Sequence, residues 1–104
     1  MLTEHAKNMS IERKTKIKEI GIGRILDYFV WDKGHKNGAE IHTITTTGLI
    51  IVRNKRTKNL VTVLIARPQQ IKRYYEYYNK PLNNAVKAVL TVAREHTAQG
   101  FNLL

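Results

Sequence analysis

The chain has no cysteine among its 104 residues. This absence excludes disulfide bonds and every metal site that is built on thiolate ligands. The four histidines are scattered along the sequence and do not have the spacing of a structural zinc cluster. We therefore expect a fold that uses no metal or other cofactor.

Long apolar runs are missing too. No stretch approaches the roughly 20 apolar residues that a membrane-spanning helix needs. The first residues, MLTEHAKNMSIERKTK, lack the apolar segment of a secretory signal peptide. We expect a soluble, cytoplasmic protein without a membrane partner, with a flexible N-terminus over residues 1–9 and a single α+β domain over residues 10–104.

Acidic residues are scarce. The sequence has 8 aspartates and glutamates against 18 lysines and arginines, which gives a formal net charge of +10. From Arg53 to Lys80, Glu76 is the only acid among the cations. Charges that only solvate a fold are usually mixed in sign, so this excess favours a polyanionic partner, and nucleic acid above all. The alternative is that lysine and arginine only keep the fold soluble.

The N-terminal third has a helical signal. Ser10 is a suitable N-cap, and isoleucines follow at rough helical spacing as far as Ile25. Gly21 and Gly23 are expected to break or kink this helix. The segment DKGHKNG then has the composition of a loop.

The middle of the chain is rich in β-branched residues. The segments AEIHTITTTG, LIIVRN and NLVTVLIAR predict three strands of an antiparallel meander. Pro68 ends the last strand, a short helix is expected over PQQIKRYYEYYNK, and a longer helix from Leu82. The predicted fold class is α+β, with an N-terminal helix, a three-stranded antiparallel meander and two C-terminal helices.

Turn chemistry suggests how the strands pair. With Thr47 and Gly48 as a two-residue turn, His42 lies opposite Arg53. With a four-residue KRTK loop, Ile51 lies opposite Thr62. Alternation then places His42, Arg53 and Thr62 on one mixed face, and leaves the other, apolar face to receive the helices.

Such a face has the groups that metal-free RNA cleavage requires. A base must take the proton of the 2′-hydroxyl, an acid must protonate the leaving oxygen, and a cation must stabilise the phosphorane. His35 and His42 are the candidate acid and base, Arg53 is the candidate phosphate ligand, and Thr62 offers a hydroxyl. The competing interpretation is that His42 is a partly buried strand histidine and His35 a solvated loop residue.

A wider set of side chains is suited to binding nucleic acid. Cations lie in the KRTK hairpin and around IKRYYEYY, where tyrosines at helical spacing cannot all face the core. Those tyrosines could equally form an aromatic hydrophobic cluster. The candidate nucleic-acid-binding residues are Arg53, Lys55, Arg56, Lys58, Arg67, Lys72, Arg73, Tyr74 and Tyr77.

The stretch EIHTITTTGLIIVRNKRTKNLVTVLIARPQQIKRYY resembles small proteins of phages and prophages of Gram-positive bacteria. Its hairpin is similar to the sheet of the barnase, EndoU, colicin and RelE-like ribonuclease superfamily. The resemblance implies metal-independent cleavage on one sheet face, with His35 or His42 as acid or base, Arg53 on phosphate, and Thr62 and Arg67 on the final strand. The long C-terminal helix departs from that pattern.

We therefore expect a small, basic, phage-associated nucleic-acid-binding protein, with RNA favoured over DNA and ribonuclease activity left open. The alternative is a phage-encoded inhibitor that binds a host or rival protein through its basic surface. A homodimer is also open, because the third predicted strand is apolar on both faces and would be a sheet edge.

Overall fold

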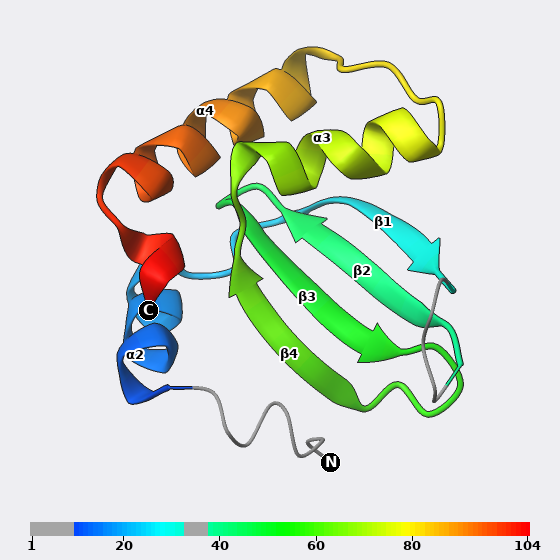
Figure 1. Cartoon of the computed structure of the whole chain (residues 1–104), viewed down its shortest axis with the longest axis horizontal. Helices are drawn as coiled ribbons and strands as arrows, with labels where there is room; N and C mark the ends of the chain where they lie inside the picture. Colours follow the sequence, from blue (N-terminus) through cyan, green and yellow to red (C-terminus); the bar gives the residue numbers. More distant parts are fainter. Residues whose placement is uncertain (1–9, 33–37) are drawn as a thin grey trace.

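The computed structural model of the chain describes residues 10–32 and 38–104. The helices and strands follow one another in the order shown in Figure 1, and the labels of that figure are used below. They are α2 (Ile11–Ile20), β1 (Ile25–Trp31), β2 (Glu40–Thr45), β3 (Leu49–Asn54), β4 (Leu60–Ile65), α3 (Pro68–Tyr77), α4 (Asn84–Ala98) and the 3₁₀-helix η1 (Phe101–Leu103).

The α+β class is confirmed, but the sheet of the described chain has four antiparallel strands in the order β1-β2-β3-β4 instead of three. The additional strand is β1, with the sequence ILDYFVW. The helix α2 ends at Ile20, and Gly21 follows as its C-cap at φ +75°. Ile25 was therefore wrongly expected on the helix, because β-branched and aromatic residues past the glycines favour a strand.

The first predicted register is wrong by one residue. His42 pairs with Val52 and Ile44 pairs with Ile50, so the loop has three residues, Thr46 to Gly48. Gly48 adopts φ +83° in the last loop position, which is the left-handed conformation that three-residue hairpin loops require. Thr45 stabilises this loop, because its Oγ1 accepts the amide of Leu49 at 3.1 Å.

The predicted register between β3 and β4 is correct beside the KRTK loop and wrong farther from this loop. Asn54 N donates to Asn59 O at 2.9 Å across the KRTK loop, and Arg53 pairs with Leu60. A β-bulge then shifts the ladder, so that Val52 pairs with Thr62. A bulge adds one unpaired residue to one strand. No turn residue in the sequence predicts the bulge between β3 and β4.

These two shifts decide which residues share a face. His42, Val52 and Thr62 form one row across the sheet, while Ile41 and Arg53 belong to the other face. A shift of one residue moves a side chain to the opposite face of a strand, so Arg53 is separated from His42 and Thr62.

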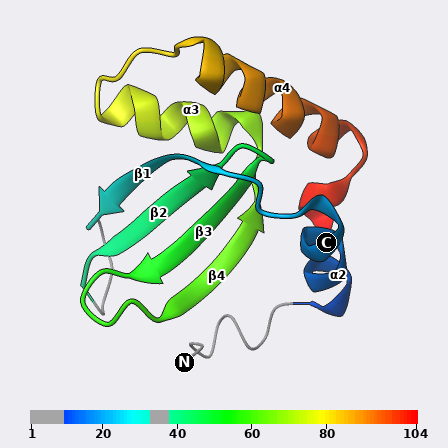
Figure 2. The ribbon, with the colours of Figure 1, turned by 180° about the vertical axis from the view of Figure 1, so that it is seen from behind.

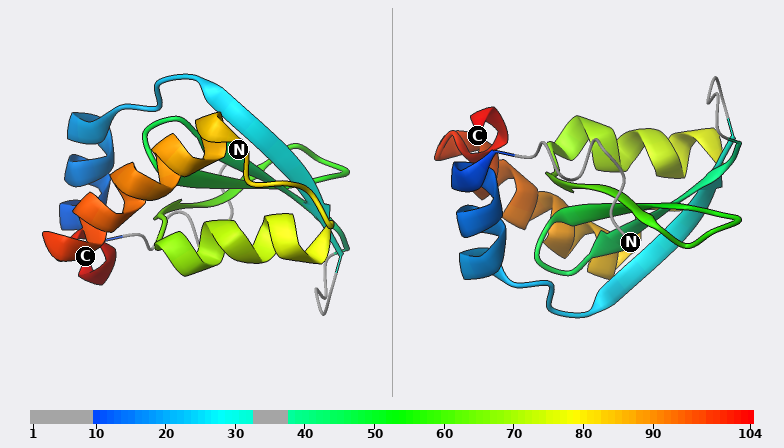
Figure 3. Two further views of the ribbon diagram at one scale, coloured as in Figure 1. Left: turned by 90° about the horizontal axis from the view of Figure 1, so that it is seen from above. Right: turned by 90° about the horizontal axis from the view of Figure 1, so that it is seen from below.

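The two C-terminal helices cover the face that bears His42. Seen from above, α3 and α4 lie in front of the sheet, and seen from below, the strands lie in front of them (Figure 3). Phe29 is the centre of this contact, because its ring stacks on Tyr74 at 5.4 Å and meets Tyr75 edge-on at 5.1 Å. The buried core consists of Phe29, Ile44, Ile50, Val52, Ala66, Ile71, Tyr74, Tyr75, Val86, Val89, Leu90 and Ala93.

The helix α4 begins later than expected. Asn83 is its N-cap, and Asn83 Oδ1 accepts the amide of Val86 at 3.0 Å. Leu82 therefore lies before the helix and is 37% exposed. Tyr78, the C-cap of α3, is 39% exposed, and its hydroxyl donates to the Val30 carbonyl.

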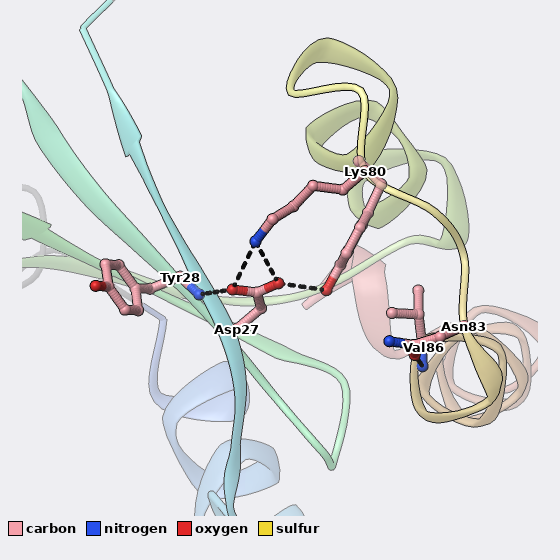
Figure 4. A network of polar contacts seen from close by, with 6 residues as sticks. Asp27, Tyr28, Lys80, Asn83 and Val86 are labelled. Carbon is pink, nitrogen blue, oxygen red and sulfur yellow. Dashed lines mark hydrogen bonds and ion pairs between the residues drawn. The ribbon is translucent and has the colours of Figure 1, made fainter.

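A polar contact ties β1 to the end of α3 at the border of this core. The Asp27 carboxylate accepts from Lys80 Nζ at 3.1 Å and from the Tyr75 hydroxyl at 3.3 Å (Figure 4). Burial, and secondarily the Asp27 carboxylate, raises the pKa of Tyr75, so its hydroxyl stays protonated. Tyr28 points away from this contact, on the opposite side of β1.

The helix α2 and η1 lie together at one end of the sheet (Figure 2). Lys16 Nζ lies 4.4 Å from the centroid of the Phe101 ring and so connects the two elements. The connection from α2 to β1 lies against the β2–β3 loop, where Thr47 Oγ1 donates to the Gly21 carbonyl at 2.6 Å. On the other side of this loop, His96 Nε2 bonds the Thr47 carbonyl at 2.9 Å.

No helix in residues 10–32 and 38–104 is both long and apolar enough to cross a bilayer. The predicted flexible N-terminus, residues 1–9, lies outside the described residues. Strand β4 is an edge of the described sheet, as is β1, and the homodimer stays a prediction.

Replacing Gly23 with alanine is expected to destabilise the fold by about 2–4 kcal/mol. Gly23 has φ +65°, and a Cβ there would lie 2.7 Å from Thr46 Oγ1 and 2.9 Å from Thr47 Cγ2. Urea unfolding measures this loss. Gly100→Ala is the control. Gly100 has φ +76°, and a Cβ added there would have nothing within 4 Å, so this substitution introduces backbone strain alone. Equal losses in the two variants would contradict close packing at Gly23.

Candidate nucleic-acid interface

On the side opposite α3 and α4, the part of the sheet towards the β3–β4 loop forms an open surface across all four strands. Tyr28, Thr43, Ile51 and Val63 are cross-strand neighbours in one row of this face. Tyr28 is 63% exposed, and the other three are half-buried. We call the surface made by Tyr28, Val30, Ile41, Thr43, Ile51, Arg53 and Val63 the open face.

The β3–β4 loop adds a basic rim to the open face. Arg53, Lys55, Arg56 and Lys58 are exposed, and none forms an ion pair with a carboxylate of the described residues. All four were among the predicted nucleic-acid-binding residues. The structure brings these four cations together at one end of β3 and β4.

The loop that carries these cations has a defined conformation. Asn54 Oδ1 accepts the amides of Arg56 at 2.9 Å and Thr57 at 3.0 Å. Lys58 adopts φ +64°, and its Nζ donates to the Lys55 carbonyl at 2.8 Å. A hollow of about 300 Å³ lies beside the loop, lined by Gly38, Ala39, Asn54, Lys55 and Arg56.

The predicted binding residues of α3 do not join the open face. Arg73 is exposed and Lys72 half-buried, but both belong to the helix layer on the other side of the sheet. Arg67 precedes this helix at the far end of β4. The nine predicted residues therefore do not form a single surface.

The two predicted stacking tyrosines have different surroundings. Tyr74 is 9% exposed and stacks on Phe29 in the core, which favours the aromatic-cluster interpretation for this ring. Tyr77 is 49% exposed, and its ring lies 5.0 Å from Trp31 in the helix layer.

The predicted catalytic residues are not gathered on an exposed surface. His42 and Thr62 are 9% and 6% exposed beneath the helix layer, whereas Arg53 is on the open face. His35 lies outside the described residues. No group of three or more His, Asp or Glu side chains in the described part of the chain could hold a metal ion.

His42 belongs to a buried chain of hydrogen bonds. Its Nδ1 is 2.6 Å from the Tyr74 hydroxyl, and its Nε2 is 3.0 Å from Glu40 Oε1. Burial raises the pKa of Tyr74 to about 12; the Arg73 charge lowers it and the Glu40 charge raises it further. All three groups are satisfied when Tyr74 donates to Nδ1 and the Nε2–H donates to Glu40. The arrangement favours the interpretation of His42 as a structural strand histidine.

Tyr28 was missed because its strand was assigned to the end of the N-terminal helix. The signal was present in ILDYFVW, where aromatic and β-branched residues outnumber good helix formers. With Phe29 assigned to the core, alternation alone places Tyr28 on the opposite face.

Comparison of the chain with protein-family models, with curated proteins and with solved structures found no match. The resemblance to the ribonuclease superfamily therefore stays a prediction, and the site is interpreted from its own geometry.

The alkaline stability of the protein is expected to depend on Tyr74. Below pH 10 its hydroxyl is protonated in the folded and unfolded states, so its buried contacts contribute in full. As the pH rises from 10 towards 12, the unfolded chain releases this proton first, and stability falls by about 1.4 kcal/mol per pH unit.

The Tyr74→Phe variant has no phenolic hydroxyl at position 74, so this proton is not released as the pH rises. Urea unfolding at pH 9 and pH 11 should therefore show that the wild type loses about 1 kcal/mol more than the variant over this interval. At neutral pH the variant should be less stable by about 1–2 kcal/mol, because the buried hydrogen bond between the Tyr74 hydroxyl and His42 Nδ1 is lost. Parallel losses in the two proteins between pH 9 and pH 11 would show that Tyr74 does not titrate as described.

Proposed function

We propose that this protein binds single-stranded RNA across the open face, without cutting it there. The observation that carries the proposal is the exposed aromatic ring of Tyr28 on an apolar sheet surface, beside a basic rim that has no carboxylate partner in residues 10–32 and 38–104. Bases stack on such a ring, and the cations neutralise the phosphates.

The shape of the surface supports a single strand. Four strands about 4.8 Å apart make a surface some 14 Å across, which is too broad to enter a groove of double-stranded nucleic acid. Unpaired bases, in contrast, can be splayed out and laid on a sheet. Ile51 and Val63 continue the apolar surface beside Tyr28 and Thr43.

Two features of the open face support RNA as the ligand. The open face contains no carboxylate, because Asp27 and Glu40 belong to the rows that face the helix layer. Thr43, directly across from Tyr28, offers a hydroxyl that can exchange hydrogen bonds with a ribose 2′-hydroxyl.

Binding without cleavage follows from the position of His42. A general base must come within about 3 Å of the proton that it removes. Both ring nitrogens of His42 are within hydrogen-bond distance of protein groups, and Trp31 stacks on its ring with centroids 6.1 Å apart. An RNA strand on the open face would have the sheet between itself and this histidine.

The inhibitor alternative gains no support from electrostatics. A net charge of +10 would be repelled by the basic surface of a protein that itself binds nucleic acid. The open face could still contact another protein, and undetectable binding of every nucleic acid tested would favour that outcome.

Removal of the Tyr28 ring is expected to weaken RNA binding by about 5- to 150-fold, because stacking contributes about 1–3 kcal/mol per base. The measurement is fluorescence anisotropy of a labelled single-stranded RNA with Tyr28→Ala, and Tyr28→Phe should retain most of the affinity. Tyr77→Ala removes an exposed ring from the helix layer as the control. An equal loss in Tyr77→Ala would place the RNA on the wrong side of the sheet for this proposal.

The basic rim is expected to account for part of the salt dependence. Lys55→Ala/Arg56→Ala should lower the slope of log affinity against log salt by about 1 to 1.5, since each phosphate contact in a single strand contributes roughly 0.7. Lys87→Ala/Arg94→Ala removes the same charge from exposed positions of α4. Unchanged slopes in the rim variant, or equal changes in both variants, would contradict phosphate contacts at the rim.

A further inference from the structure

A second basic pocket lies at the other end of β4, where α2, α3 and η1 meet. Its volume is about 140 Å³, and its walls are Arg13, Leu64, Ile65, Arg67, Gln70, Phe101 and Asn102. We call it the Arg13–Arg67 pocket. The basic rim is joined to the opposite end of this six-residue strand, about 20 Å away along the chain. The pocket is therefore separate from the rim.

The two arginines bring uncompensated positive charge to this pocket. None of its wall residues is acidic, and neither Arg13 nor Arg67 forms an ion pair with a described carboxylate. Lys16 is nearby at Phe101 but is paired with Glu19 at 2.7 Å. The net charge of the pocket therefore comes from the two guanidinium groups.

Arg13 has no carboxylate partner among the described residues. Its side chain is half-buried, and its Nε is buried with no hydrogen-bond partner in the described chain. A partly desolvated and unpaired cation costs free energy, and an anion beside it recovers that cost. This arrangement is expected where a ligand completes the site.

The remaining polar groups offer one donor and one acceptor to a ligand. Gln70 Oε1 accepts the Arg67 amide at 2.8 Å, which leaves the Gln70 NH₂ group as a donor. Asn102 Nδ2 donates to the Ile65 carbonyl at 2.6 Å and fixes η1 against β4. The buried Asn102 Oδ1 has no partner in the described residues and can accept from a hydroxyl of the ligand.

We propose that the Arg13–Arg67 pocket binds a phosphate group, presented either by a small phosphomonoester or by the phosphorylated end of an RNA. Two guanidinium groups form the paired, charge-assisted hydrogen bonds that phosphate oxygens accept. A volume of 140 Å³ equals four to five waters at about 30 Å³ each, which suffices for the five heavy atoms of phosphate. This inference does not depend on RNA binding at the open face.

The test uses inorganic phosphate as the probe, at constant ionic strength, with calorimetric titration and thermal unfolding as readouts. Phosphate should bind the wild type and raise its Tm. Arg67→Gln and Arg13→Gln should each weaken this binding by about 10- to 100-fold. Arg13→Lys keeps the positive charge but lacks the planar guanidinium group, so its affinity for phosphate should lie between those of the wild type and Arg13→Gln. Arg94→Gln removes an exposed charge of α4 and should bind phosphate like the wild type.

Loss of phosphate binding in Arg94→Gln to the same degree, or no binding to the wild type, would overturn the proposal. Arg67 is exposed, so Arg67→Gln tests the pocket even if Arg13→Gln fails to fold. The two sources are then separated with RNAs of one sequence that carry a 5′-phosphate or a 5′-hydroxyl.

Tighter binding of the phosphorylated RNA by the wild type, and not by Arg67→Gln, assigns the pocket to an RNA end. Equal affinity for the two RNAs assigns it to a small phosphomonoester. In the same titrations, Tyr28→Ala should weaken both RNAs and leave inorganic phosphate unaffected, so failure of the open-face proposal and failure of the pocket are distinguishable.

Discussion

The packing of Phe29 against Tyr74 and Tyr75 is the contact on which the arrangement of this protein depends. It holds α3 on one face of the sheet, with α4 beside it, and buries Ile44, Ile50 and Val52 beneath them. Aromatic pairs of this geometry add about 0.5–1.5 kcal/mol each to the free energy of burial. Because these two helices cover a single face, the ring of Tyr28 is exposed on the second face, of which Leu49 and Ile65 form the buried end.

The same arrangement separates the charges. Asp27 and Glu40 belong to the covered side, where they bond Lys80 and His42 and so complete the hydrogen bonding of the core border. The cations of the β3–β4 loop lie on the exposed rim without a carboxylate partner among the described residues. The rim therefore presents four cations of a chain with a net charge of +10 at a place where a polyanion can approach.

Composition and pattern could predict much of this protein. The fold class, the strands β2 to β4, the approximate position of the C-terminal helices and the basic loop all follow from local propensity and from charge counts, which depend on neighbouring residues alone. The strand β1 could have been found too, because ILDYFVW has strand composition. The candidate catalytic set could not be verified in this way, since it required the register of two hairpins, and that register changed with one left-handed glycine and one bulge.

The sequence by itself therefore determined that the protein is a small, basic α+β chain with an unbalanced cationic loop. Only the tertiary structure decided that Arg53 and His42 lie on opposite sides of the sheet, that Tyr28 is exposed, and that Arg13 and Arg67 share a pocket. The physical reason is that side chains alternate along a strand, so that a change of one residue in a loop, as between β2 and β3, or a bulge, as between β3 and β4, changes which residues share a face. The Arg13–Arg67 pocket is lined by residues of α2 and of the start of α3 that are more than fifty positions apart, and no periodicity within either segment encodes this proximity.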